Sequence, residues 1–589
     1  MKTNQTKEFS ETFDGFKGLD VSSPIGSGRL SRLRNFKLLS DGSAIKRNGF
    51  RYVVSLGGEP RGKISYSDGG EDVILAAVEN QLVRVSLGSG SIDSAEIFSE
   101  SEGRVEFFEL RGRLYIAENG TFYRYTGGVS VEPCVPYIPC YGIRWPANSY
   151  RVGVVNEPFN ILTPKIRVSY TSSDDNIVHM KVGFPIKRID AVFRNGVRIE
   201  DATFNIDREG VGIFCEGFVG CIGAEVEVFV TLDTEEHLDS GLGGCDRAAV
   251  FDSFENSRVF MYGGEDSGRF YVSPVVSEDK LLSQAQVYGG ADPIYFYKGG
   301  EFRFGGMDSI SGMCRVFDRM VMFSNHRSWV TSSLCDDVGS SRLGVIVEVL
   351  SETTGCTSED AFRMIGGATP VTVSRGGIYK WSMDPDFETE AVLTRISDKV
   401  SAHVGEDFLK NALVCYNHEG NELWFGSSIS ENGEVLIYNC ENGAWWLYDG
   451  IFADSFLETG AGTAFLRDGD IYIFDSEAVC DRLKEGERDI EGEIESAGFD
   501  FSHTALKKHI VGANLLCELD GGRIALTLND GRELGAADVD KSSASPLHVG
   551  ADLFELRFRT SRTERVKFNL RAAGQSRQRV FGIEFFAEA

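Results

Sequence analysis

Residues 411–475 contain four short runs rich in aromatic and β-branched side chains: 423–426 (LWFG), 434–438 (EVLIY), 444–448 (AWWLY) and 470–474 (DIYIF). Such runs suit a pleated, half-buried sheet. The Asn-Gly and Asp-Gly pairs between them favour the positive φ angles of tight hairpin turns. This stretch therefore predicts a series of antiparallel hairpins, with a strand about every 10–12 residues, as in a sandwich, barrel or propeller.

Weaker copies of the pattern recur at 72–85, 105–125, 259–272, 319–330 and 371–381. Roughly six to eight units are present, and a repeat of about 40–50 residues is the period of propeller blades. A blade cannot bury both of its faces alone, so blades stack and close into a ring. The predicted fold is all-β, an irregular β-propeller with an inserted β-sandwich or barrel domain and a C-terminal β module.

Changes in amino-acid composition along the chain predict how it divides into segments. Prolines mark an extended connector after the first blades, and a charged segment precedes the last module. The predicted segments are an N-terminal arm and hairpin (1–50), first blades (51–132), connector (133–157), inserted β-sandwich or barrel (158–239), remaining blades with insertions (240–480) and C-terminal β module (481–589). Within the later blades, helices are predicted over 277–286 and 357–365.

Charge and length restrict the function. The 589 residues exceed what one core usually holds, and 88 acidic against 60 basic residues give a net charge of −28. That sign argues against the whole protein gripping nucleic acid, because phosphate binding needs Lys and Arg. The N-terminus has no apolar signal region, and no run approaches the roughly 18 apolar residues of a membrane span. We therefore expect synthesis in the cytoplasm without membrane insertion.

The opening 50 residues carry a recognisable order of glycines, a basic pair and aromatic residues. It resembles the opening of bacteriophage proteins of the tail nozzle family, also called tail tubular protein B, and of related phage stabilisation proteins. The matching residues are Gly18, Leu19, Asp20, Pro24, Asn35, Phe36, Asp41, Gly42, Lys46, Arg47, Gly49 and Phe50. One departure is Lys17, which stands where those proteins often have glycine.

The resemblance implies a structural virion protein that forms part of the DNA ejection conduit below the tail adaptor. It implies a homo-oligomeric ring, a hexamer in this family, that contacts adaptor or portal-associated proteins and lets viral DNA pass without specific binding. The expected location is the virion tail, after synthesis in the host cytoplasm. Two alternatives are a tail protein that binds host surface glycan and, less favoured, a propeller glycosidase or lyase.

Basic residues crowd the last third of the C-terminal module. They suggest a subunit or adaptor docking patch, although the polar face of a sheet would look the same. The candidate interface residues are Arg557, Arg559, Arg562, Arg565, Lys567 and Arg571, with Arg577 and Arg579 following.

No catalytic motif stands out. The sequence has no G-x-S-x-G elbow, Walker loop or H-E-x-x-H pair, and its eight histidines are dispersed. His237 lies between carboxylates, which could form a metal or proton site but is more typical of a solvated linker. The pairs Asp384/Asp386 and Asp468/Asp470 could serve a glycosidase or bind Ca²⁺, but they lack the spacing of known calcium loops and first indicate turns. We therefore expect no enzyme activity, no catalytic residues, no cofactor and no metal site.

The adjacent Trp445 and Trp446 are expected on one strand, where successive side chains point to opposite faces. One should pack between blades, and the other should face solvent or a neighbouring subunit.

Overall fold

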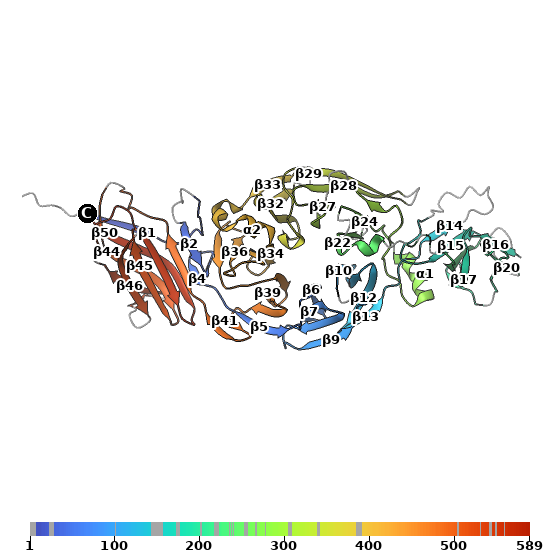
Figure 1. The fold of residues 1–589 in the computed structure, drawn as a ribbon, viewed down its shortest axis with the longest axis horizontal. Coiled ribbons are helices and arrows are strands. Elements are labelled where there is room, and N and C mark those ends of the chain that lie inside the picture. Colours follow the sequence, from blue (N-terminus) through green and yellow to red (C-terminus); the bar gives the residue numbers. More distant parts are fainter. Residues whose placement is uncertain are drawn as a thin grey trace, which may run out of the picture.

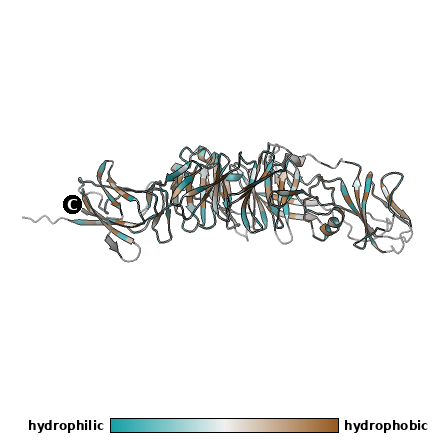
Figure 2. Cartoon of the chain, turned by 90° about the horizontal axis from the view of Figure 1, so that it is seen from below, coloured by the Kyte–Doolittle hydropathy of each residue, from teal (hydrophilic) through white to brown (hydrophobic). Residues whose placement is uncertain are grey.

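The structure is a computed structural model. It describes residues 7–22, 29–99, 102–142, 157–171, 177–200, 203–216, 223–234, 236, 238, 241–252, 257–264, 268–276, 278–303, 309–337, 342–383, 391–503, 506–530, 532–540, 545–547, 551–558 and 560–589. Figures 1 and 2 show three parts in line, with a propeller between the C-terminal module and an inserted domain. In Figure 2, brown apolar stretches lie along the propeller strands.

Seven four-stranded antiparallel units in the described residues form the blades of the ring. Blade one contains β6 (Gly62–Asp68), β7 (Glu71–Val78), β8 (Gln81–Ser86) and β9 (Ile92–Glu96), and blade two contains β10 (Val105–Leu110), β11 (Arg113–Glu118), β12 (Thr121–Gly127) and β13 (Ser130–Pro133). Blade three contains β22 (Arg247–Phe251), β23 (Arg258–Tyr262), β24 (Phe270–Val272) and β25 (Glu301–Phe302). Blade four contains β26 (Gly312–Val316), β27 (Arg319–Phe323), β28 (Ser328–Asp337) and β29 (Arg342–Ser351). Blade five contains β30 (Phe362–Ile365), β31 (Thr369–Ser374), β32 (Gly377–Met383) and β33 (Ala391–Arg395). Blade six contains β34 (Ala412–Asn417), β35 (Glu422–Ser427), β36 (Val435–Asn439) and β37 (Trp445–Tyr448). Blade seven contains β38 (Ser455–Thr459), β39 (Gly462–Arg467), β40 (Asp470–Phe474) and β5 (Phe50–Ser55). The predicted propeller is confirmed.

The ring is closed by the N-terminal part of the chain. Strand β5 pairs antiparallel with β40, placing Phe50 opposite Phe474 and completing blade seven. The hairpin β41 (Cys480–Leu483) and β42 (Gly486–Asp489) extends the same sheet beyond β5. Blade seven in turn contacts blade one through β38 and β6. Closure therefore depends on strands more than 400 positions apart.

Tight turns connect the blade strands as the sequence predicts. In Asn119-Gly120 the φ angles are 46° and 77°, and in Asp468-Gly469 they are 51° and 74°. Two successive positive φ angles are the requirement of a type I′ hairpin turn, whose twist matches that of the flanking strands. The acidic pair Asp468/Asp470 is therefore turn chemistry.

The inserted domain leaves the ring between blades two and three. Its larger sheet is β14 (Cys140–Gly142), β15 (Lys165–Thr171), β21 (Glu225–Leu232), β17 (Ile186–Arg194) and β18 (Val197–Arg198), and its smaller sheet is β16 (Ile177–Lys181), β20 (Gly212–Glu216) and β19 (Asn205–Ile206). Their buried side chains, including Ile166, Val228 and Ile213, form one core. A short 3-10 helix, η1 (Gly241–Gly244), precedes blade three.

Helix α1 (Glu278–Tyr288) lies at the junction with this domain and confirms the helix expected over 277–286. The buried Gln284 accepts a hydrogen bond from the Ile138 backbone N–H and donates one to the Pro136 carbonyl. The helix is therefore held against the extended connector.

The C-terminal module consists of two sheets that also contain the first strands of the chain. One is β3 (Phe36–Leu38), β4 (Ala44–Lys46), β50 (Gln578–Glu588), β44 (His509–Leu519), β48 (Ala551–Arg557) and β47 (Ser545–Leu547), with β1 (Glu8–Phe13) also on β50. The other continues blade six through β2 (Leu30–Arg34) into β43 (Gly492–Ser496), β49 (Lys567–Ala573), β45 (Arg523–Asn529) and β46 (Glu533–Asp540). The described N-terminal strands thus form no independent arm, because they complete the sheets of the module and of blade seven.

Two further expectations differ from the structure. Residues 357–365 form a short 3-10 turn, η2 (Glu359–Ala361), followed by β30, because pairing with β31 outweighs the local helix-cap signal. The true short helical segments nearby are η3 (Ser397–His403) and α2 (Glu406–Lys410). Trp445 and Trp446 lie on opposite faces of β37, but both are buried, because blade six packs on both sides.

Candidate functional site

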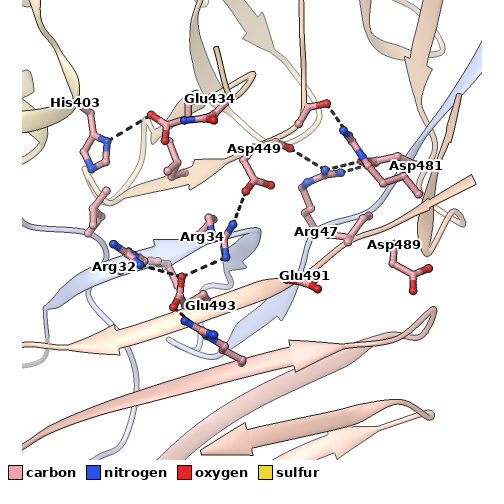
Figure 3. A pocket seen from close by; sticks show the side chains of 18 of the residues that line it. Arg32, Arg34, Arg47, His403, Glu434, Asp449, Asp481, Asp489, Glu491 and Glu493 are labelled. Atoms are coloured by element: carbon pink, nitrogen blue, oxygen red, sulfur yellow. Dashed lines mark hydrogen bonds and ion pairs between the residues drawn. The ribbon is translucent and has the colours of Figure 1, made fainter. Parts of the chain in front are cut away.

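A cavity of about 820 Å³ lies where β2, blade six, the β41–β42 hairpin and the C-terminal module meet. We call it the seam cavity, after the lining residues Arg32, Arg34, Asp449, Asp481 and Glu493 (Figure 3). Charged side chains from segments far apart in the sequence point toward one another across it.

Glu493 on β43 is the acidic centre of the seam cavity, with a side chain 1% exposed. The guanidinium groups of Arg32, Arg34 and Arg571 each lie 3.2 Å from its carboxylate, and the Asn569 amide donates a hydrogen bond at 2.7 Å. Burial opposes ionisation, but the Asn569 hydrogen bond and the arginines outweigh it and lower the pKa of Glu493. The carboxylate is therefore held ionised and is fully occupied by partners.

Asn35 organises the opposite wall. Its φ of 54° is in the left-handed region, which asparagine tolerates better than most residues. The side-chain amide donates to Asp449 and to the Glu491 carbonyl, while its oxygen accepts from the Asp449 N–H at 3.0 Å and from Arg47 Nε at 2.9 Å. One short side chain thus joins β2, blade six and the start of β43.

Arg47 extends this network toward blade seven. Its Nη1 and Nη2 donate to Oδ1 and Oδ2 of Asp481 at 2.8 and 2.9 Å, and both side chains are buried. Arg488 also contacts Asp481, at 2.7 Å. Fork-to-fork pairing of this kind fixes geometry as well as charge.

Three neighbouring residues of the opening motif, Lys46, Gly49 and Phe50, also make contacts that hold the fold together. Lys46 donates to the Gly574 carbonyl, and burial lowers its pKa to about 8. A Cβ on Gly49 would lie 1.8 Å from the Cys480 carbonyl oxygen, so only glycine lets β5 and β41 approach this closely. Phe50 is 1% exposed and packs edge-on against Phe465 with ring centroids 4.9 Å apart.

This arrangement suits a rigid joint better than a reaction centre. The buried carboxylates of Glu493 and Asp481 and the half-buried one of Asp449 all contact arginine guanidinium groups. Among the described residues, one set of three carboxylates is close enough to share a metal ion, namely Glu59, Asp454 and Asp468. All three are exposed and lie outside the seam cavity.

The structure distributes the predicted interface residues over several surfaces. Arg557 is exposed on β48, Arg562 donates to His509 Nε2 at 3.1 Å, and Arg565 donates to the Gly498 carbonyl at 2.9 Å. Lys567 pairs with Glu495 at 3.3 Å, on the same strand as Arg571.

Among the described members of this set, Arg571 alone lines the seam cavity, and its acidic partner belongs to the same chain. Arg559, His237, Asp384 and Asp386 lie outside the described residues.

Sequence reasoning missed Glu493, Asp449 and Asp481. Each is a single acidic residue in or beside a strand, and no spacing links it to its arginine partner. In β43 the order Glu493, Ile494, Glu495 places Glu493 on the polar face of the strand, so nothing local in the sequence marks it as buried.

No helix among the described residues has the length and apolarity needed to cross a lipid bilayer. No protein-family model and no curated protein matches the chain. Among solved structures, U3-55K is 9% identical, covers 72% of this chain and 98% of its own, and has a TM-score of 0.34.

The β-propeller domain of Cps50 (Swd1) from Myceliophteria thermophila is 8% identical and covers 72% of this chain and 98% of its own, with a TM-score of 0.31. The extracellular domain of the one-component system BT4673 from B. thetaiotaomicron is 9% identical and covers 91% and 82%, with a TM-score of 0.26. Likeness at this level carries no functional argument. The chain is an all-β propeller protein by its own sheet topology.

Proposed function

We propose that the chain is a structural subunit of a ring in the tail of a short-tailed bacteriophage, in the nozzle below the adaptor. It would assemble as a homo-hexamer, contact adaptor or portal-associated proteins, and line part of the path of the ejected DNA. This proposal starts from the opening motif at residues 18–50 and its resemblance to the tail nozzle family.

The observation that carries the proposal is the role of those motif residues in the fold. Asn35, Lys46, Arg47, Gly49 and Phe50 join the propeller to the C-terminal module and complete the ring. A motif that maintains a joint between large rigid parts suits a component that transmits force or position. It also suits the in-line arrangement of three parts, whose two ends can contact different neighbours (Figure 1).

The charge of the chain supports a role beside DNA. A conduit must not bind what passes through it, and each Lys or Arg that meets a phosphate adds counterion-release affinity. The net charge of −28 opposes such binding. The surfaces that face the DNA are expected to be acidic on balance, and the exposed basic residues Arg557, Arg562 and Arg565 of the C-terminal module are expected at subunit or adaptor contacts.

The test is the composition of purified virus particles. Quantitative mass spectrometry should find the chain in the copy number of one hexameric ring, and gold-labelled antibodies against it should mark the tail below the adaptor. Particles produced without the chain should lack the distal tail and regain it on complementation. Absence of the chain from complete particles would overturn the proposal, whereas labelling of peripheral fibres would favour the host-recognition alternative.

A further inference from the structure

A second cavity, of about 390 Å³, lies between the β3–β4 hairpin, blade six and blade seven. Its walls include Lys37 of β3, Trp424 of β35 and Thr463 of β39. We call it the hairpin cavity, after the β3–β4 hairpin. Its volume is within the range of sites for small organic molecules.

The charges in the hairpin cavity are nearly balanced. The cations that line it are Lys37, Lys46, Arg47 and Arg577. The carboxyl groups that line it are Glu419, Glu422 and Asp475. Each cation already has an acceptor in the chain: Lys37 lies 2.6 Å from Glu422, Arg47 is held by its buried carboxylate partner, and the other two donate to backbone carbonyls. The cavity therefore favours a neutral ligand over an anion or a cation.

Hydrogen-bond donors and acceptors line the hairpin cavity together. Lys37 and Arg577 each make one such contact with the described residues, so further N–H groups remain to donate. Asp475 accepts from the Glu477 N–H through Oδ1, which leaves Oδ2 as an acceptor. A hydroxyl group donates one hydrogen bond and accepts two, so a ligand rich in hydroxyl groups can use both kinds of partner at once.

Thr463 adds a buried polar group that the fold itself leaves unpaired. The residue is 4% exposed, and its hydroxyl group has no hydrogen-bond partner among the described residues. It lines the hairpin cavity. An unpaired buried hydroxyl group is unfavourable, so a ligand hydroxyl group that pairs with it would be stabilised.

An aromatic wall completes the cavity. Trp424, Tyr448 and Phe474 line it, and the Trp424 ring packs edge-on against both neighbours, with centroids 4.6 Å from Phe474 and 5.6 Å from Tyr448. The Trp424 Nε1–H also donates to Glu422 at 3.1 Å, which fixes the ring. A pyranose sugar carries hydroxyl groups around its edge and C–H groups on its faces, so it matches a rigid apolar wall beside convergent polar groups.

We infer that the hairpin cavity binds a neutral hexose unit, either free or at the end of a glycan. Hydroxyl groups of the sugar pair with Thr463, Lys37 and Asp475, and a C–H face of the ring packs against Phe474. This inference does not rest on the proposed tail function, since it concerns the isolated chain.

The experiment is calorimetric titration of the full chain with glucose, galactose and mannose at neutral pH. Glucuronate and glucosamine, which carry opposite charges, are the comparison probes. At least one neutral hexose should bind at one saturable site and more tightly than either charged probe. The methyl glycoside of that hexose separates the two sources, because a site for the end of a glycan accepts it and a site for the free sugar does not.

Thr463→Val should weaken hexose binding roughly 3- to 10-fold, the loss expected for one neutral hydrogen bond. Thr463→Ser keeps the hydroxyl group and should retain most of the affinity. The control Thr121→Val, at an exposed position of blade two, should bind like the wild type.

Folding of each variant is checked by its melting curve. Thr463→Val is expected to fold, because valine has nearly the same shape and the lost hydroxyl group bonds to no described residue. Should it fail to fold, Asp475→Asn keeps the bond from the Glu477 N–H, removes one acceptor from the cavity and should weaken binding by a similar factor. The inference is overturned if no hexose binds saturably at millimolar concentration, if folded variants bind as tightly as the wild type, or if a charged probe binds as tightly as the neutral sugar.

Discussion

Arg47 and Asp481, 434 positions apart in the chain, form a two-pronged buried ion pair at 2.8 and 2.9 Å. Arg47 leads into the strand that closes the ring, and Asp481 lies in the hairpin that extends blade seven. This pair therefore holds the first and last parts of the propeller together.

Replacing Arg47 with Ala should lower the free energy of unfolding by about 3–5 kcal/mol, because it leaves the Asp481 carboxylate buried and deprived of its two-pronged partner. Differential scanning calorimetry measures the change. The matched control is Arg482→Ala, whose pair with Glu487 is exposed on both sides, and it should cost at most about 1 kcal/mol. Equal effects of the two variants would show that the buried pair has no special part in stability.

Gly49→Ala should destabilise the ring closure, because the new Cβ would lie 1.8 Å from the Cys480 carbonyl oxygen and the backbone there must shift. We expect a loss of about 1–3 kcal/mol or more in chemical denaturation. Gly88→Ala is the control, since nothing lies within 4 Å of the methyl group that alanine would add there, and it should melt like the wild type. Unchanged stability of Gly49→Ala would contradict the close approach of β5 and β41.

Trp445→Ala and Trp446→Ala should each cost about 3–5 kcal/mol, since both rings are buried. Conservative changes should separate the two. Trp445→Phe breaks the hydrogen bond from Nε1 to the Ile396 carbonyl at 3.1 Å, whereas Trp446 Nε1 has no hydrogen-bond partner among the described residues to lose. Trp445→Phe should therefore lower the melting temperature more than Trp446→Phe. Leu282→Ala, at an exposed position on α1, is the control.

Glu106 should make stability depend on pH. Burial and Glu359 raise its pKa from 4.5 to about 8 in the folded chain, so folding favours the protonated form. This stabilisation is complete below pH 4.5 and is lost as the pH rises toward about 8. The glutamine of Glu106→Gln cannot ionise. The free energy of unfolding of this variant should therefore rise relative to that of the wild type as the pH increases from 4.5 to about 8. The exposed Glu109→Gln on the same strand should follow the wild type, and parallel curves for Glu106→Gln would refute the assignment.

Reversing Arg562 and Arg565 to Glu should impair particle assembly and leave the isolated fold intact. Both side chains are exposed, and each donates one surface hydrogen bond, to His509 and to the Gly498 carbonyl. Charge reversal at a docking surface changes the rate of encounter with the partner and the register of the complex more than it changes the fold. Assembly is measured by electron microscopy of complemented particles, with the exposed Arg532→Glu in the same module as the control. Normal assembly by the double variant would remove these residues from the interface.

Local sequence determined the blade hairpins. The runs of aromatic and β-branched residues in 423–426 and 434–438 and the turn at Asp468-Gly469 depend on neighbours within a few residues, so the strands β35, β36 and β40 could be predicted. The same holds for α1, which has a continuous stretch without helix breakers.

Tertiary structure decided the pairings that cross the chain. Nothing in the sequence near Phe50 says that it completes blade seven, and nothing near Glu493 names Arg32, Arg34 and Arg571 as partners. Residues 357–365 carry helix-cap signals, yet 362–365 form a strand because β31 supplies hydrogen bonds along its length. Both tryptophans of β37 are buried because packing covers its two faces. The physical reason is that propensity and turn chemistry act over a few residues, whereas burial and ion pairing depend on which distant surfaces meet.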